Sequence, residues 1–107
     1  MKAGRELDAL VAEKVMGHDM EKDFCTTCYD SPTCDRPIPR YSILIQDAWP
    51  VVEKMADRRH PFELVKTPIS YWVCRFYGEI IRDIYKGYAD TAPLAICLAA
   101  LKAVEAT

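Results

Sequence analysis

Apolar and polar residues alternate along residues 5–16 with the period of an amphipathic helix. Apolar residues recur every three or four positions, and charged residues fill the positions between them, so that one face would be buried and the other solvated. Gly17 follows directly, and glycine often ends a helix because it adopts positive φ without strain. The pattern therefore predicts a first helix that ends at Gly17. Its apolar face would consist of Leu7, Leu10, Val11 and Val15.

A second helix is predicted over residues 42–57, with Ser42 as its N-cap. Pro50 interrupts this helix, because proline lacks an N–H and its ring clashes with the carbonyl four residues earlier, at a cost of about 3 kcal/mol if unrelieved. We expect a bend near residues 46–50, and the alternative is a helix that restarts with Asp47 as its N-cap. The apolar stripe would consist of Ile45, Ala48, Trp49, Val52 and Met55.

The third predicted helix covers residues 90–106 and has Pro93 in its first turn, where a missing N–H costs no hydrogen bond. It is apolar on nearly all sides, because Lys102 and Glu105 are its charged residues after the cap. A helix of this kind lies either at the centre of a core or under a second subunit. We expect a homodimer that packs through residues 91–105, with burial inside one chain as the alternative.

Between the second and third helices the pattern changes to that of strands. A short strand is predicted around residues 62–64, and residues 70–78 are rich in aromatic and β-branched residues, as strands are. A turn at residues 78–79 would return the chain through a strand at 80–88, although a helix over 79–86 is an alternative. With three helices and a mainly antiparallel sheet of three to four strands, the chain belongs to the α+β class.

The apolar residues of segment 18–40 follow neither the helical nor the strand period. Three prolines between residues 32 and 39 forbid a long regular element, although a short strand is possible over 20–24. Loops of this length are unusual inside a compact domain, so the segment would be functional, held by a ligand, or mobile. We expect a single domain over residues 1–107 that contains this irregular, cysteine-bearing loop.

Length, net charge and the distribution of apolar residues narrow the range of functions that the protein could have. The chain has 107 residues, enough for one core, and its 14 basic and 16 acidic residues give a net charge of −2, which does not favour non-specific nucleic-acid binding. No stretch reaches the roughly 18 uninterrupted apolar residues of a membrane span, and the charged N-terminal residues do not resemble a signal peptide. We therefore expect a cytosolic protein that does not bind membranes.

The irregular loop carries candidate metal ligands. A C-x2-C pair can hold two positions of a tetrahedral zinc ion, with a further cysteine and a histidine as the other ligands. Two alternatives stay open: unreactive thiols on a loop, and a redox C-x-x-C pair, although the strand-to-helix setting that lowers a thiol pKa is missing. No cofactor other than structural zinc is expected. The candidate zinc ligands are His18, Cys25, Cys28 and Cys34.

Arginine and tyrosine residues form a second candidate site. Arginine binds phosphate oxygens with two hydrogen bonds, and tyrosine rings offer stacking surfaces for bases, so such a set could bind a small anionic ligand of the nucleotide type. The alternative is that Arg75 pairs with an acidic residue on a neighbouring strand while the tyrosines cover the sheet. The candidate ligand-binding residues are Arg40, Tyr41, Arg75, Tyr77, Arg82 and Tyr85.

Three segments together resemble a known family: RELDALVAEKVMG at 5–17, YSILIQDAWPVVEKM at 41–55 and ADTAPLAICLAALKAV at 89–104. They are similar to the phage ABA-sandwich domain family, which consists of small proteins from phages and prophages of Gram-positive bacteria. The resemblance implies helical layers that enclose a small sheet, an α/β/α sandwich, and it implies no catalytic residues. The chain departs from the family pattern at Pro50, where a glutamate-like residue is usual, and in its cysteine run.

These observations favour a non-enzymatic phage accessory protein of the host cytoplasm. The chain has no Gly-rich phosphate loop, no serine elbow and no paired carboxylates on a shared face. By analogy with other small phage proteins, it would counter host defence by sequestering a small anionic nucleotide-type signal or by binding a host protein. One alternative is a zinc-stabilised structural or adaptor module built on the His18 and cysteine cluster. Another is a thiol-based redox protein.

Overall fold

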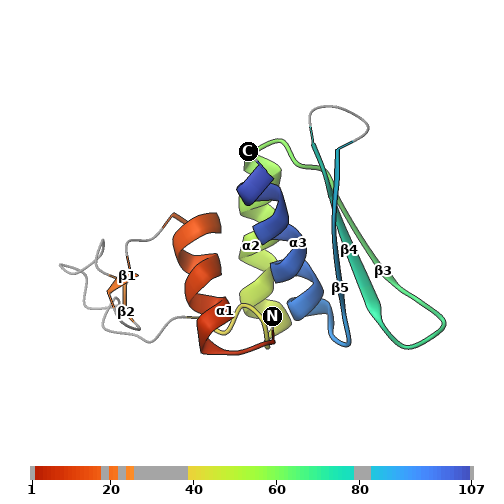
Figure 1. Cartoon of the computed structure of the whole chain (residues 1–107), viewed down its shortest axis with the longest axis horizontal. Helices are drawn as coiled ribbons and strands as arrows, with labels where there is room; N and C mark the ends of the chain where they lie inside the picture. The colour runs from red at the N-terminus through yellow and green to blue at the C-terminus, as the bar shows by residue number, and fades with distance from the viewer. Residues whose placement is uncertain (1, 18–19, 22–23, 26–38, 79–82, 107) are drawn as a thin grey trace.

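The computed structural model describes residues 2–17, 20–21, 24–25, 39–78 and 83–106 (Figure 1). The helices are α1 (Arg5–Leu10), its π-helical continuation η1 (Val11–Val15), α2 (Ile45–Asp57) and α3 (Ala92–Ala106). The strands are β1 (Met20–Glu21), β2 (Phe24–Cys25), β3 (Phe62–Lys66), β4 (Trp72–Tyr77) and β5 (Ile84–Ala89).

The main sheet has the order β3-β4-β5, and both strand pairs are antiparallel. Helices α2 and α3 lie side by side on one face of this sheet, and α1 with η1 packs on the far side of these two helices (Figure 1). The predicted α+β class, with three helices and an antiparallel sheet, is confirmed. The layers differ from the enclosed sheet that the family resemblance implies, because the described helices all lie on one side. Among the residues that the structure describes, no helix or further strand covers the other face of the sheet.

The first helix agrees with its prediction. It runs without a break from α1 into η1, where Met16 N–H donates to the Val11 carbonyl at 3.0 Å, one residue farther than in an α-helix. Gly17 has a φ of 77°, as its role at the end of the helix requires. The predicted apolar face is buried, since Leu7, Val11 and Val15 are fully inaccessible.

Helix α2 begins three residues later than predicted, and Ser42 is not its cap. The Ser42 backbone N–H and hydroxyl both donate to Oδ1 of Asp8, at 2.8 and 2.6 Å, so this serine ties α1 to the segment before α2. Leu44 occupies the N-cap position. The predicted restart at Asp47 is wrong, because Asp47 and Pro50 both lie inside one continuous helix.

The end of α2 is closed by a Schellman motif. Arg59 has a φ of 63°, its N–H donates to the Ala56 carbonyl at 2.9 Å, and His60 N–H donates to the Met55 carbonyl at 3.0 Å. The motif turns the chain from α2 into β3. Arg58 also donates to the Val15 carbonyl at 3.1 Å, which joins the ends of α2 and η1.

Helix α3 lies at the centre of the core. The sheet covers one of its sides, and α2 and η1 cover others. Gly87 of β5 allows this close approach, because a Cβ there would lie 2.3 Å from the Ala95 carbonyl oxygen and 2.6 Å from Ala99 N. Burial within one chain therefore explains the apolar character that suggested a subunit interface along residues 91–105. Its fully buried residues are Ala95, Ile96, Cys97, Ala99, Ala100 and Ala103.

The strands alternate between a core-facing and an open face. Trp72, Cys74 and Phe76 point toward the helices. The helix alternative for residues 79–86 is wrong where the structure describes the chain, since β5 begins at Ile84. Gly78 N–H donates to the Asp83 carbonyl at 2.7 Å and joins the two ends of the β4–β5 connection.

Candidate functional site

The open face of the sheet, which we call the outer face, carries the side chains that alternate away from the helices. Strand register places them in rows that run across β3, β4 and β5. The residues of the outer face are Glu63 and Val65 on β3, Val73, Arg75 and Tyr77 on β4, and Ile84, Lys86 and Tyr88 on β5.

A charged row crosses the middle of the outer face. Glu63 lies opposite Arg75, and Arg75 lies opposite Lys86. Arg75 forms an ion pair with Glu63, and the two side chains are 31% and 46% exposed. An ion pair this exposed contributes about 1 kcal/mol or less to stability. Arg75 therefore pairs with an acidic residue on a neighbouring strand, as the alternative prediction stated.

An apolar row lies beside the charged row. Val65, Val73 and Tyr88 are in register, and Val65 and Tyr88 are 41% and 52% exposed, while Val73 between them is only 4% exposed. The Tyr71 and Tyr88 rings lie 6.1 Å apart between centroids. On the other side of the charged row, Ile84 is 40% exposed. The outer face is thus an exposed sheet surface with apolar residues on both sides of a line of charges.

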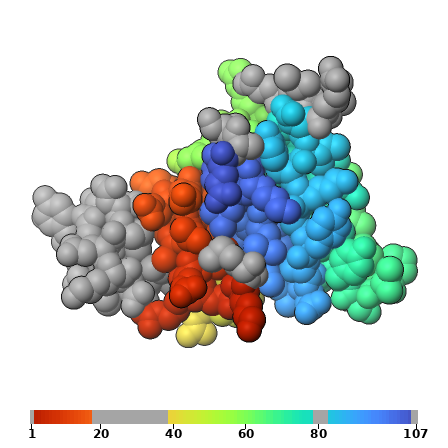
Figure 2. All heavy atoms as spheres, viewed as in Figure 1, coloured from red at the N-terminus to blue at the C-terminus, as the bar shows by residue number. Residues whose placement is uncertain are grey.

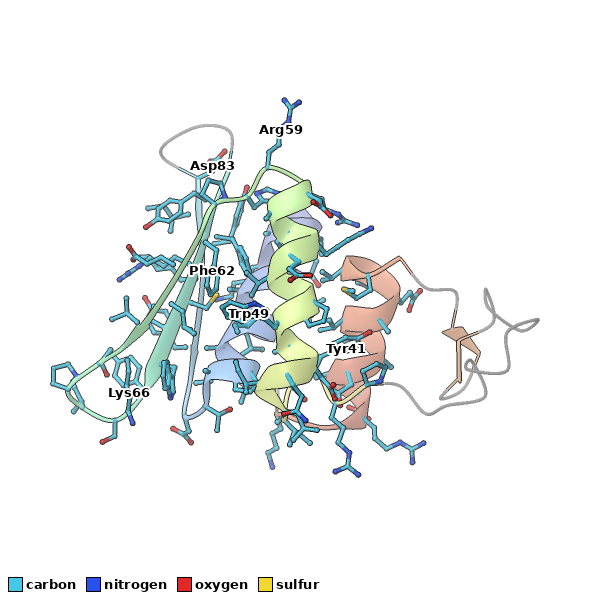
Figure 3. The ribbon with its side chains drawn as sticks, turned by 180° about the vertical axis from the view of Figure 1, so that it is seen from behind. Tyr41, Trp49, Arg59, Phe62, Lys66 and Asp83 are labelled. Carbon is cyan, nitrogen blue, oxygen red and sulfur yellow. The ribbon has the colours of Figure 1, made fainter. Side chains whose placement is uncertain are left out.

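The predicted Arg/Tyr set is not gathered in one place. Arg75 and Tyr77 lie on the outer face, whereas Tyr85 faces the core, where its ring lies 6.1 Å from that of His60. Tyr41 is 3% exposed and is part of the core near α1 and α2 (Figure 3). Arg40 lies before α2, where its backbone N–H donates to the Asp47 carboxylate at 3.0 Å. The remaining member, Arg82, lies outside the described residues.

The zinc hypothesis falls almost wholly outside the described residues. His18, Cys28 and Cys34 are not among them, and Cys25 is described only as part of the backbone ladder between β1 and β2. Within the described ranges, no three His, Cys, Asp or Glu side chains group so that they could hold a metal. Zinc binding by the loop therefore stays a prediction.

Two cysteines lie in the core. Cys74 on β4 and Cys97 on α3 are both free thiols and fully inaccessible. Burial raises the pKa of Cys74 from 9.0 to about 12. Burial raises the pKa of Cys97 further, with added effects of the Asp8 carboxylate and of Cys74. Because the thiolate is the reactive form, these two thiols are unreactive in the folded protein near neutral pH.

Two buried polar residues that sequence analysis did not identify, Asp8 and His60, form hydrogen bonds between different elements of the fold. Asp8 is 3% exposed and accepts both hydrogen bonds of Ser42, whose hydroxyl oxygen in turn accepts the Gly4 N–H at 3.0 Å. His60, 7% exposed, forms a hydrogen bond between Nδ1 and the Tyr77 carbonyl at 3.0 Å. These groups serve the fold, since each has its partners inside the protein.

A second exposed apolar group lies at the start of α2. Ile43, Ile45 and Trp49 are 48%, 45% and 48% exposed. The Trp49 ring meets Phe62 of β3 edge-on, with centroids 6.0 Å apart (Figure 3). This group is separated from the outer face by the thickness of the sheet, because Phe62 faces the core side.

These features define a class of protein: a small α+β domain with a three-helix core and one open sheet face. Seen from the same side as in Figure 1, the atoms of α3 and β5 form one continuous surface, because α3 packs directly against the sheet (Figure 2). Among the described residues, no helix combines the length and apolar character that crossing a membrane requires.

Comparison with known proteins gives the family. Residues 9–101 match the family model of the phage ABA sandwich domain, and the chain belongs to this family. A crystal structure of a phage protein from Bacillus cereus ATCC 14579 is similar to the chain, with a TM-score of 0.79 and 29% sequence identity. The similarity covers 95% of this chain and 91% of that one. No curated protein matches the sequence. The chain is thus a small phage protein domain.

Proposed function

We propose that this phage protein acts in the host cytoplasm by binding, without catalysing a reaction, and that the outer face is its binding surface. The observation that carries the proposal is the apolar row on the open sheet, where Val65 and Tyr88 are about half exposed. Exposed apolar residues beside polar ones are typical of protein interaction sites. Tyrosine is also enriched among the residues that dominate the binding energy of such sites.

The outer face supports a protein partner better than a small ligand. Small molecules are usually bound in concave pockets that enclose most of their surface. The outer face is instead an open sheet, and the Arg/Tyr residues that would surround a nucleotide lie in different parts of the fold. We therefore favour protein binding over nucleotide sequestration. A role against host defence would depend on which host protein is bound.

Site-specific photo-crosslinking tests this proposal. A photoreactive amino acid in place of Val65 should give a covalent adduct with a protein when the phage protein is expressed in a bacterial host. The matched control carries the same amino acid in place of Glu13, which is exposed on η1 far from the sheet. Adducts only from position 65 support the outer face. Equal adducts from both positions, or none from position 65, would contradict the proposal.

Nucleotide-type anion binding is the second candidate, favoured by one observation. The charged row holds two cations, Arg75 and Lys86, for one carboxylate, and Tyr77 lies beside them. Calorimetric titration with nucleotides would show binding that Arg75→Ala and Lys86→Ala both weaken, while Lys14→Ala, an exposed cation on η1, has no effect. The nucleotide should be recovered chemically unchanged. Affinity that is the same in all four proteins would remove this candidate.

A further inference from the structure

We propose that the protein surface bound by the outer face is the outer face of a second copy of this chain. Two open sheets would then close on each other as a two-layer β-sandwich, the arrangement in which antiparallel sheets commonly bury apolar faces. This inference rests on the proposed function, because it names the partner of the same surface. It follows from the order of charges and apolar residues on that surface.

In one face-to-face orientation of two copies, the oppositely charged edges of the charged row meet each other. From β3 to β5 it reads Glu63, Arg75, Lys86, so one edge is negative and the opposite edge is positive. A twofold axis that runs parallel to β4, between the two sheets, places β3 of one copy over β5 of the other and keeps each row level. Glu63 of each copy then faces Lys86 of the other, so both edges of the interface carry opposite charges. Arg75 on the central strand meets its own counterpart in this orientation and in the alternative one below, so the edges and not the centre distinguish the two.

The other face-to-face orientation is disfavoured by the same row. A twofold axis that runs across the strands through this row places each strand over its own copy. Glu63 would then face Glu63, and Lys86 would face Lys86, which is repulsive on both edges. The charges therefore select one alignment of the two sheets.

The apolar row fits the selected orientation. Val65 on β3 would cover Tyr88 on β5 of the second copy, whereas Val73 between them is already 4% exposed and adds little surface to the contact. Val65 and Tyr88 are 41% and 52% exposed in the single chain, so this contact removes apolar surface from water. The interface would thus have apolar contacts on one side of a complementary line of charges.

The size of the face predicts a reversible dimer. Strands of five and six residues, spaced by about 4.8 Å and rising by about 3.3 Å per residue, make a face of roughly 15 by 20 Å. Standard protein interfaces bury about 800 Å² per partner, and this face lies below that size. The dimer should therefore dissociate on dilution, so it must be measured over a wide range of protein concentration.

Charge exchange is the decisive test, with sedimentation equilibrium as the measurement. Lys86→Glu places a second carboxylate beside Arg75 and leaves the folded monomer intact, but it opposes Glu63 of the second copy. It should weaken dimerisation by about tenfold or more. The double variant Glu63→Lys with Lys86→Glu exchanges the two edges and should restore the dimer. A dimer that Lys86→Glu leaves unchanged, or that the double variant does not restore, overturns the inference.

An apolar pair of variants gives an independent test. Val65→Lys should weaken the dimer, whereas Ile45→Lys, at a similarly exposed position on α2, should not; their exposed fractions are 41% and 45%. Circular dichroism checks that both variants are folded. A wild-type protein that stays monomeric at every concentration overturns the inference. In that case the crosslinking experiment still decides the proposed function, because an adduct with a different protein from position 65 would support it alone.

Discussion

Besides Ser70, Arg59 is the non-glycine residue with a positive φ among those that the structure describes. Its φ of 63° lies in the left-handed region, where the Cβ of an ordinary residue costs about 1 kcal/mol or more relative to glycine. The Schellman motif at the end of α2 requires this conformation, and its side chain is exposed. Glycine would meet the same requirement without the steric cost.

We predict that Arg59→Gly stabilises the protein by about 0.5–1 kcal/mol, since the relief of strain outweighs the greater flexibility of glycine in the unfolded chain. Urea denaturation gives the free energy of unfolding. The matched control is Ala56→Gly, an exposed position inside α2, which should destabilise by about 1 kcal/mol. A loss of stability in Arg59→Gly would show that its left-handed conformation is not strained.

The two buried thiols predict a pH dependence. Unfolded thiols ionise near their ordinary pKa of 9.0, whereas Cys74 keeps its proton to a pKa of about 12 and Cys97 beyond that. Above pH 9 the unfolded state therefore binds fewer protons than the folded state. Stability is fully present below pH 9 and falls as the pH rises toward 12, by about 1.4 kcal/mol per pH unit for each thiol.

Unfolding free energies measured from about pH 8 to about pH 11 test this slope. The control is the double variant Cys74→Ala with Cys97→Ala. It should be less stable at every pH, because it leaves cavities, but its stability should fall less steeply above pH 9. Identical slopes in the two proteins would mean that the thiols do not set the alkaline limit.

At the scale of elements, Pro50 is the residue whose effect on α2 the sequence did not fully predict. Proline in a helix interior costs about 3 kcal/mol, so a bend or a restart was expected. The structure has one continuous helix over Ile45–Asp57, which excludes the restart at Asp47. Ala48, Val51 and Met55 lie in the core and Pro50 on the exposed side. Burial of the apolar stripe outweighs the local cost, which propensity alone does not reveal.

We predict that Pro50→Ala stabilises the protein by about 1–2 kcal/mol, because it restores a backbone hydrogen bond and removes the ring clash without disturbing the core. Thermal unfolding followed by circular dichroism measures the effect. Glu53→Ala, a nearby exposed position on the same helix, should change stability by about 0.5 kcal/mol or less. If Pro50→Ala were neutral or destabilising, α2 would already accommodate the proline without cost.

The contact between α3 and β5 depends on one glycine. We predict that Gly87→Ala destabilises the protein by about 2–3 kcal/mol, because the new methyl group would collide with the backbone of α3 rather than with a movable side chain. Lys86→Ala, the adjacent position on the outer face, is the control and should have a small effect. Chemical denaturation compares the two. Equal effects would mean that α3 can shift away from the sheet at no cost.

At the scale of the whole molecule, the sequence predicted the class and the elements but not the layers. Periodicity shows which side of an element is apolar, and it correctly placed Leu7, Val11 and Val15 on the buried side of the first helix. It does not show which elements share one side of a sheet, because that depends on contacts between distant segments. An ion pair of Arg75 with an acidic residue on a neighbouring strand was predicted as an alternative, but its partner Glu63 was not identified, since the two become neighbours only through strand pairing.

The zinc hypothesis also concerns the whole molecule, because a zinc ion would hold together a segment for which the sequence predicts no apolar core. Elemental analysis of purified protein should find about one zinc ion per chain if His18, Cys25, Cys28 and Cys34 bind it. Cys28→Ser should then lower the zinc content, whereas Cys97→Ala, at a buried thiol, should not. A zinc content near zero in the wild-type protein rejects the hypothesis.

The central position of α3 has a consequence for how the chain folds during synthesis. The sheet and the other helices pack around this element, yet it follows all of them in the chain. While a ribosome makes the preceding residues, the core lacks α3, and the inner face of the sheet lacks the helix that covers most of it. Folding therefore waits for residues 92–106 to emerge. A nonsense codon shortly before Ala92 would leave about 85% of the chain, residues 1–91 at most, without a fold.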